Sequence, residues 1–274
     1  SNKSPRSVAC FIGLMSGTSL DGVDAVIADI SAASRPQGHG HLHLPLPAAL
    51  RAELLALNQS GSDEIHRAAL AANALMRLYA QAVSELLQQS GLSAVDVAAL
   101  GAHGQTVRHR PGACDGFGYT TQLVNGALLA ELTGIAVVCD FRSRDVAAGG
   151  QGAPLVPAFH AACFAQPQHD VAVLNLGGIA NLTLLPKHGP VLGFDTGPGN
   201  VLMDLWVQRH LALAFDGDGA WAASGQVDGV LLERLLRDDY FQRPPPKSTG
   251  RDLFHADWLN AQVAPELASQ QVMA

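Results

Sequence analysis

Two glycine-rich turns, each set between apolar segments, constrain the fold of this chain most strongly. The first is 15–24, Met-Ser-Gly-Thr-Ser-Leu-Asp-Gly-Val-Asp, and the second is 177–181, Gly-Gly-Ile-Ala-Asn. The apolar segments that flank them read as strands: 8–14 and 23–30 around the first, 171–176 and 182–185 around the second. A strand therefore follows each turn, whereas a helix follows the turn of a P-loop or of a dinucleotide-binding fingerprint.

Such turns can act as phosphate cradles, because closely spaced backbone amides hold an anion without net positive charge. In the first turn, Gly17 and Gly22 allow close approach of the backbone, and Thr18 and Ser19 add hydroxyl donors. A plain hairpin closed by Asp21-Gly22 is the alternative for this turn. The second turn favours the phosphate interpretation, because one cradle in each half of the chain suits a nucleoside triphosphate.

The length of 274 residues predicts two domains. Periodicity alternates between strand and helix, which is typical of an α/β architecture. The glycine- and alanine-rich run 147–154 is the predicted boundary, so the domains are expected at 1–146 and 147–274. The predicted helices are 65–89, 125–133, 200–213 and 231–236, and the other predicted strands are 95–100, 135–140 and 191–194.

Charge and composition exclude several classes of protein. With 17 Lys and Arg against 24 Asp and Glu, the net charge of -7 argues against a nucleic-acid surface, so an anionic ligand must be bound locally. No run of about 18 apolar residues predicts a membrane span, and no leader peptide is recognised. The four cysteines lack paired spacing, which indicates a reducing, cytoplasmic setting.

Asp195 is the candidate general base, because it follows a predicted strand and begins the glycine-rich turn 195–199. An acid that interacts with the dipole of the next helix is the alternative. The first amides of that helix lack partners within it, so the turn is also a candidate site for an anion or a sugar hydroxyl, close to Gly197 and Asn200.

A second polar cluster is predicted in the first half. His103, Gln105 and Thr106 follow the strand 95–100 and offer groups suited to sugar hydroxyls, although His103 also fits a hydrogen-bonded core position. The segment containing Arg142, Arg144 and Asp145 could bind a substrate carboxylate through a guanidinium group. A surface ion pair with Asp145 is the alternative.

Two groups of side chains are candidates for metal binding. Asp21 and Asp24 could hold Mg²⁺ through water, since that ion prefers oxygen ligands and keeps much of its hydration shell. His39, His41 and His43 alternate along a predicted strand. No cysteine or acidic partner completes a metal set for them in the sequence, which favours a solvated edge strand.

The chain resembles the bacterial anhydro-N-acetylmuramic acid kinases, within the superfamily of sugar kinases, Hsp70 and actin. The resemblance runs from about Phe11 onward. It rests on six motifs in the same order: 15–24, 103–106, 140–160, 175–181, 194–200 and 247–251. It implies two ribonuclease-H-like domains around a cleft, the second expected to be incomplete because family members continue further.

The resemblance also implies residue roles. The implied ATP phosphate loop contains Gly17, Thr18, Ser19, Leu20, Asp21, Gly22, Val23 and Asp24, and the second phosphate turn contains Gly177 and Gly178. Asp195 is the implied base. The implied sugar-binding residues are His103, Gln105, Thr106 and Arg142. Asn125, Gly197 and Asn200 are further candidates for binding the sugar.

The implied reaction uses ATP and Mg²⁺. Family enzymes open the anhydro bridge of 1,6-anhydro-N-acetylmuramic acid with water and phosphorylate O6, a step of peptidoglycan recycling. The expected partner is this small sugar, and a homodimer is a candidate assembly. Two alternatives stay open: a kinase of the same superfamily acting on another sugar or on polyphosphate, and a non-catalytic muropeptide-binding sensor.

Overall fold

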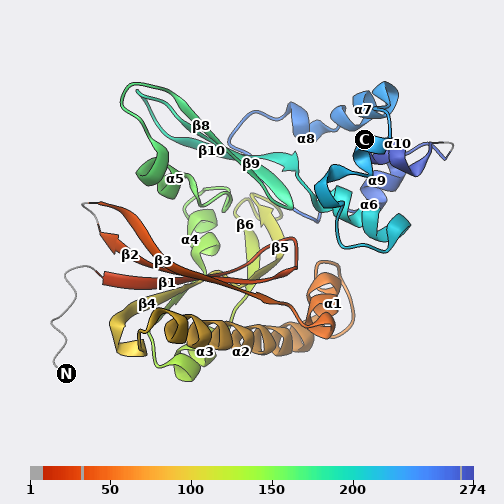
Figure 1. Ribbon diagram of the computed structural model, residues 1–274. Coiled ribbons are helices and arrows are strands. Elements are labelled where there is room, and N and C mark those ends of the chain that lie inside the picture. Colours follow the sequence, from red (N-terminus) through yellow and green to blue (C-terminus); the bar gives the residue numbers. More distant parts are fainter. Residues whose placement is uncertain (1–8, 32–33, 266) are drawn as a thin grey trace. The chain divides into compact units, whose positions relative to one another are not determined.

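A five-stranded mixed sheet organises the first part of the computed structural model, which describes residues 9–31, 34–265 and 267–274 (Figure 1). The strand order is β3-β2-β1-β4-β7. β1, β2 and β3 are antiparallel neighbours, and β4 and β7 run parallel to β1. The strands span Ala9–Ser16, Gly22–Ser31, Ser34–Pro45, Val97–Ala102 and Val137–Cys139 for β1, β2, β3, β4 and β7. Three antiparallel strands followed by two parallel ones is the ribonuclease-H-like order that the sequence resemblance implies.

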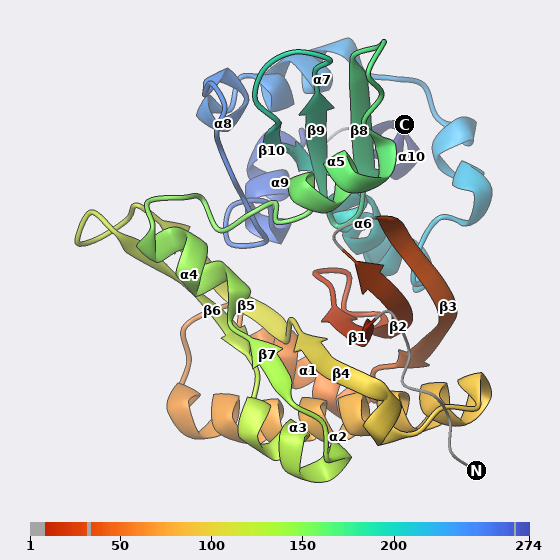
Figure 2. The same ribbon diagram turned by 90° about the vertical axis from the view of Figure 1, so that its left-hand side faces the viewer.

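The long helix α2 (Glu64–Ser90) covers one face of this sheet, where it packs on β2 and β3. Its apolar side chains recur every three or four residues, and one stripe is buried, including Leu75, Met76 and Tyr79. Gly91 ends the helix in the left-handed conformation, as its position predicts. α3 (Gly126–Thr133) packs against α2, and the two helices lie on the same side of the sheet in both views (Figures 1 and 2).

The remaining elements of the first unit are shorter. Two strands, β5 and β6, form a separate antiparallel hairpin that was not predicted from the sequence. Asp115 closes its turn by accepting hydrogen bonds from the amides of Phe117 and Gly118. The bounds are α1 Ala48–Ala56, η1 Ala94–Asp96, β5 Gln105–Pro111, β6 Gly118–Leu123 and α4 Phe141–Ala147.

One predicted strand begins later than expected. The sequence predicts strand from Val95, but residues 94–96 form a short 3-10 helix, and β4 starts at Val97. The Asp96 carboxylate accepts hydrogen bonds from both the amide and the hydroxyl of Ser93, which fixes this turn. A local side-chain cap therefore overrides the apolar run.

The second unit contains a three-stranded antiparallel sheet in the order β10-β9-β8. Its described residues contain no parallel strand joined to that sheet. The strands are β8 Val171–Leu176, β9 Ile179–Leu185 and β10 Leu192–Pro198. The helices are α5 Pro157–Phe164, α6 Val201–Leu211, η2 Gly217–Gly219, η3 Ala222–Ser224, α7 Gly229–Leu236, α8 Asp239–Gln242, α9 Ala256–Gln262 and α10 Ser269–Met273. The α/β class is confirmed.

The two units divide between Gly152 and Ala153. The boundary expected after residue 146 falls at the end of α4 and stays a prediction. The four cysteines are free thiols in the structure. Within the described ranges, no helix has the length and hydropathy needed to cross a bilayer.

Helix α2 offers a matched test of this packing. We expect Leu75→Ala to destabilise the first unit by about 2–5 kcal/mol, because Leu75 is 0% exposed and a cavity would remain. Leu70→Ala, in the same helix at a site 55% exposed, should change the unfolding free energy by less than about 0.5 kcal/mol. Urea denaturation of both variants measures the difference, and equal losses would contradict the assigned helix face.

Candidate active site

The first glycine turn joins β1 to β2 and is held by its own backbone and side chains. The Leu20 amide donates to the Gly17 carbonyl at 3.2 Å, and the Leu20 side chain is buried. One oxygen of Asp21, Oδ1, accepts from the Ser19 hydroxyl at 2.7 Å and from the Gly22 amide at 2.9 Å. β2 continues directly with Val23, which is fully buried. The predicted strand-turn-strand unit is confirmed.

The two glycines of this turn occupy different surroundings. A Cβ on Gly22 would collide with the His43 ring and the Leu44 carbonyl, so glycine is required there by the protein itself. A Cβ on Gly17 would meet only the Ser19 hydroxyl, at an ordinary 3.7 Å. The backbone at Gly17 is therefore open to a close approach from outside the chain.

Gln105 is hydrogen-bonded to Ser16, the residue at the end of β1 that leads into the turn. Its side-chain oxygen accepts a 2.6 Å hydrogen bond from the Ser16 hydroxyl, and both residues are buried. The backbone of His103 also donates to the Leu14 carbonyl at 3.0 Å, which ties the end of β4 to β1. These contacts give Gln105 a structural role, and its expected contact with a sugar stays a prediction.

His103 and Arg142 form a polar pair beside this connection. The Nδ1–H of His103 donates to the Gly104 carbonyl at 2.7 Å, so Nε2 is free to accept the 2.8 Å hydrogen bond from Nε of Arg142. A second nitrogen of Arg142 donates to the Gly152 carbonyl at 2.7 Å. Burial and, to a lesser degree, the Arg142 charge lower the pKa of His103 from 6.5 to about 4. His103 is therefore neutral at pH 7.

The glycine-rich segment after α4 folds back onto that helix. The Asp145 carboxylate accepts from the Gly152 amide at 2.7 Å, and a Cβ on Gly150 would collide with the same carboxylate. His109 lies 3.0 Å from the Thr120 hydroxyl and contacts the Gln151 backbone. Asp145 therefore fixes the glycine-rich segment that follows α4. This finding replaces the expectation that Asp145 is part of a substrate clamp or a surface ion pair.

Thr106 and Asn125 are also engaged by the protein. The Thr106 hydroxyl accepts a hydrogen bond from the side-chain amide of Gln122 at 3.2 Å. Asn125 caps α3 by accepting from the Leu128 amide at 3.0 Å, and it donates to Asn73 of α2 at 2.8 Å. These bonds give Asn125 a structural role at the start of α3, and its expected contact with a sugar stays a prediction.

Asp24 lies on β2 among the histidines of β3. Its Oδ1 is 3.0 Å from Nε2 of His41 and 3.0 Å from Nδ1 of His43, while His39 pairs with Asp29 at 2.8 Å. The prediction of a solvated edge strand is consistent with these exposed pairs. Within the described residues, no group of three or more His, Cys, Asp or Glu side chains is arranged to hold a metal ion.

In the second unit, the second glycine turn packs against the start of α6. The carbonyl of Gly178 accepts from the Gly199 amide, and the carbonyl of Gly177 accepts from the Asn200 amide, both at 2.9 Å. The Val201 amide donates to the Gly178 carbonyl at 3.2 Å. The sequence predicted that these amides would be unpaired and could bind an external anion. The structure corrects that expectation, because the carbonyls of the glycine turn accept their hydrogen bonds.

Asp195 lies inside β10, in a row of polar residues across the sheet. The predicted turn 195–199 is largely strand, since β10 runs to Pro198. The register pairs Asn175 with Asn181 and Asn181 with Asp195, so the three side chains share one face. A bulge follows Asp195 in the register, a feature that often re-aims side chains beside active sites. Asp195 is only 4% exposed.

The loop after α8 fixes Asp195 by backbone contacts. The Thr249 amide donates to Oδ2 of Asp195 at 3.0 Å, and the Asp195 amide donates to the Lys247 carbonyl at 3.0 Å. The Tyr240 hydroxyl donates to the Asp195 carbonyl at 2.7 Å. Burial, followed by the Asp195 charge, raises the pKa of Tyr240 well above its usual range. Tyr240 therefore stays a hydrogen-bond donor, and the Asp195 side chain is held in one position.

Among the described residues of this unit, three buried polar atoms have no hydrogen-bond partner: Oδ1 of Asn181, Oδ1 of Asn200 and Oγ1 of Thr249. Asn181 is the cross-strand partner of Asp195, Thr249 contacts it, and Asn200 adjoins Gly177. Buried polar groups are normally paired, so each of these atoms has hydrogen-bonding capacity for a bound water or ligand. Asn181 and Thr249 were not singled out from the sequence, because only the strand register and the folded loop bring them to Asp195.

The other glycines predicted for this site differ in their surroundings. A Cβ on Gly177 would lie no closer than 3.6 Å to the Ile179 carbonyl, which leaves room for close approach. A Cβ on Gly197 would lie 2.7 Å from the Phe241 ring, so glycine is needed there for packing. Contact between Gly197 and a sugar stays a prediction.

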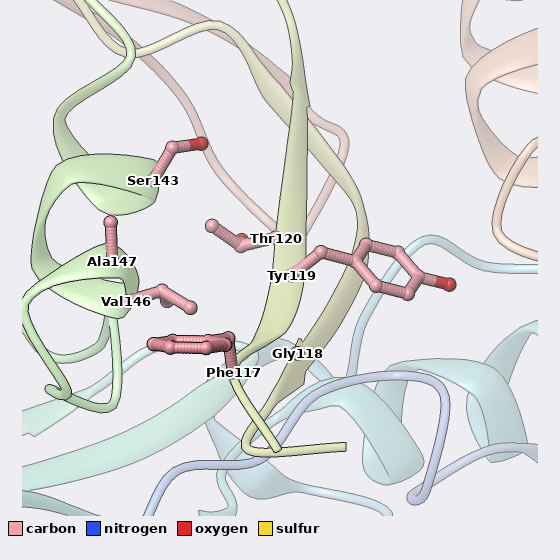
Figure 3. A pocket seen from close by; sticks show the side chains of 7 residues that line it. All are labelled: Phe117, Gly118, Tyr119, Thr120, Ser143, Val146 and Ala147. Atoms are coloured by element: carbon pink, nitrogen blue, oxygen red, sulfur yellow. The ribbon is translucent and has the colours of Figure 1, made fainter. Parts of the chain in front are cut away.

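A cavity of about 310 Å³ lies in the first unit, between the β5–β6 hairpin and α4. Figure 3 shows Phe117, Thr120 and Val146 around it, with Tyr119 pointing to the other side of its strand. Its lining is mostly apolar and contains none of the predicted site residues.

The protonation state of His103 can be tested by titration. Because its pKa is lowered from 6.5 to about 4, its ring should stay neutral from pH 8 to pH 5. The unfolded chain binds this proton more readily, so stability should fall as pH falls from about 6.5 towards 4. NMR titration of the ring carbons, assigned with His103→Gln, measures the midpoint. A midpoint near 6.5 would contradict the buried pair with Arg142.

The first turn predicts opposite results for two similar substitutions. Gly22→Ala should lower the melting temperature, because the added methyl group collides with β3. Gly17→Ala should leave it unchanged but weaken ATP binding about tenfold or more, by blocking hydrogen bonds to a charged group. Differential scanning fluorimetry and calorimetric titration with ATP separate the two effects. Unchanged ATP affinity in Gly17→Ala would remove this turn from the phosphate site.

Comparison with known proteins adds to this geometry. The family model described as anhydro-N-acetylmuramic acid kinase matches residues 9–274. The anhydro-N-acetylmuramic acid kinase of Bordetella petrii is 62% identical over 269 residues, 96% of this chain and 70% of that protein. The kinase of the same name from Variovorax paradoxus is 62% identical over 264 residues, 94% of this chain and 70% of that protein.

Among solved structures, an exopolyphosphatase-like protein aligns with 87% of this chain and 63% of its own, at 13% identity and a TM-score of 0.39. That likeness is weak, and the strand order describes the fold better. The family model and the two sequence relatives agree in name and cover nearly all of the chain. The chain belongs to the anhydro-N-acetylmuramic acid kinase family.

Proposed function

We propose that this protein is an ATP-dependent kinase that opens the anhydro bridge of 1,6-anhydro-N-acetylmuramic acid with water and phosphorylates O6. The product would be N-acetylmuramic acid 6-phosphate, an intermediate of peptidoglycan recycling. Family membership supports the reaction. The observation that carries the residue assignment is the buried Asp195 carboxylate, held by the Thr249 amide among unpartnered polar groups.

Each unit contributes one turn suited to phosphate. In the first, the open backbone at Gly17 and the hydroxyl of Thr18 would bind phosphoryl oxygens, while the Ser19 hydroxyl donates to Asp21. In the second, Gly177 has room beside its backbone for the same purpose. Phosphoryl transfer depends mainly on positioning and charge stabilisation, which preformed turns provide.

Asp195 would act as the general base. It takes a proton from water, the water oxygen bonds to the anomeric carbon, and the bond from that carbon to O6 breaks. O6 then forms its bond to the γ-phosphorus as the bond to ADP breaks. An ordinary glycosidase needs a second carboxylic acid to protonate the leaving oxygen. Here a phosphoryl group captures the leaving O6, so that acid is not needed.

Two polar side chains are proposed to orient the sugar, Arg142 and Asn200. Arg142 is held by His103 and Gly152, so its guanidinium is fixed in direction. A fixed guanidinium suits the lactyl carboxylate of a muramic sugar. Asn200 has an unpartnered buried oxygen that could accept from a sugar hydroxyl.

Asp21 is the carboxylate that would hold Mg²⁺. Its Oδ1 closes the turn, which leaves Oδ2 to face a hydrated ion, whereas Asp24 is occupied by His41 and His43. When bound, the ion would neutralise phosphate charge. Free cysteines are consistent with a reducing cytoplasm as the site of this reaction.

Asp195→Asn tests the assignment. It should lower kcat about 10²–10⁴-fold, the range of general-base catalysis, and leave sugar and ATP binding largely intact. ADP release and calorimetry with 1,6-anhydro-N-acetylmuramic acid, on the full-length gene product, measure both. A wild-type protein that binds the sugar without releasing ADP would favour a sensor. Activity only on another sugar or on polyphosphate would favour a different kinase.

A further inference from the structure

Two polar atoms beside Asp195, on Asn181 and Thr249, make no hydrogen bond within the described part of the protein. Asn181 stands directly opposite Asp195 across β9 and β10, and its Oδ1 is buried without a partner. Thr249 donates its backbone amide to Asp195 at 3.0 Å, while its hydroxyl is buried without a partner. That hydroxyl is only three bonds from the bonded amide nitrogen, so it lies close to the same carboxylate.

We propose that Asn181 and Thr249, together with Asp195, hold the water molecule that attacks the anomeric carbon. The inference rests on the proposed function, because it takes Asp195 as the base. Thr249 and Asn181 are positioning residues for that water, and Asp195 alone receives its proton.

The hydrogen-bonding capacity of water matches this set. Water donates two hydrogen bonds and accepts through two lone pairs. Asp195 accepts one hydrogen, Asn181 Oδ1 accepts the other, and the Thr249 hydroxyl donates to one lone pair. The second lone pair is then free and fixed in direction for attack. A bound water typically makes about three such bonds, which these groups supply.

The step balances without a further reactant. The Asp195 carboxylate takes one proton from the water, and the water oxygen forms a bond to the anomeric carbon. The electron pair of the bond between that carbon and O6 moves to O6, which bonds to the γ-phosphorus of ATP. ADP leaves with the electron pair of the broken phosphorus–oxygen bond. Asn181 and Thr249 gain and lose no covalent bond.

A purely structural role for the Thr249 hydroxyl is disfavoured by the contacts that hold its loop. The backbone carbonyl of Lys247 and the backbone amide of Thr249 make the bonds to Asp195, and the Lys247 ammonium donates to the Tyr240 carbonyl at 3.0 Å. The same ammonium lies 4.7 Å from the centre of the Tyr240 ring. None of these contacts uses the hydroxyl, so its removal should not disturb the loop.

The test compares Thr249→Val, which removes only the hydroxyl, with Thr249→Ser, which keeps it. In the full-length gene product, Thr249→Val should lower kcat about 10²-fold, as expected for the loss of one preorganised hydrogen bond, with KM for the sugar unchanged. Its melting temperature should be unchanged or higher, because an unpaired buried hydroxyl is removed. Thr249→Ser should recover most of the activity.

Asn181→Leu provides a second arm. If both residues hold the same water, their effects should not add, and Thr249→Val should cost little activity in the Asn181→Leu background. Additive losses, or a loss of melting temperature that parallels the loss of activity, would overturn the proposal. An increase in KM with kcat kept would also overturn it, because the hydroxyl would then bind the sugar.

Asp195→Asn in the same assay separates this inference from the proposed function. If Asp195→Asn stays active, the proposed base is wrong, and the inference fails with it. If Asp195→Asn is inactive while Thr249→Val retains wild-type kcat, only the assignment of Thr249 fails.

Discussion

A carboxylate that is removed from water must find hydrogen-bond donors in the protein, and this requirement organises the second unit around Asp195. Its side chain accepts from the Thr249 amide, while its own backbone is bonded on both sides, to Lys247 and to Tyr240. Tyr240 in turn packs edge-on against Phe254, which is fully buried. The position of the base is thus set by backbone groups and an aromatic cluster, and the neighbouring side chains remain available for ligands.

The first unit uses a different device to fix a polar group. A histidine beside an arginine would normally be disfavoured if both were charged. Here the Gly104 carbonyl accepts a hydrogen bond from the Nδ1–H of His103, so Nε2 is an acceptor for Arg142. The lowered pKa of His103 keeps the ring neutral at pH 7, so the ring adds no positive charge beside Arg142. A neutral imidazole therefore orients a cation without weakening its attraction for an anion.

Much of the secondary structure could be predicted from the local spacing of apolar residues and glycines. The amphipathic period of α2, its glycine terminator and both strand-turn-strand units were predicted from residue spacing and are present in the structure. The positions that differed were decided by side-chain hydrogen bonds: the Ser93–Asp96 cap delays β4, and Asp145 binds Gly152. The row from Asn175 to Asp195 depends on strand register, and the place of Thr249 depends on a loop more than 50 residues from Asp195. Such pairings become visible only in the folded chain.

The glycine-rich segment that ends the first unit is less free than its composition suggests. Asp145 holds its far end, and at Gly150 any larger residue would collide with that carboxylate. Glycine at this position therefore allows close packing of the backbone against Asp145 and does not indicate a flexible linker. Lengthening the glycine run would therefore break these contacts and loosen the end of α4.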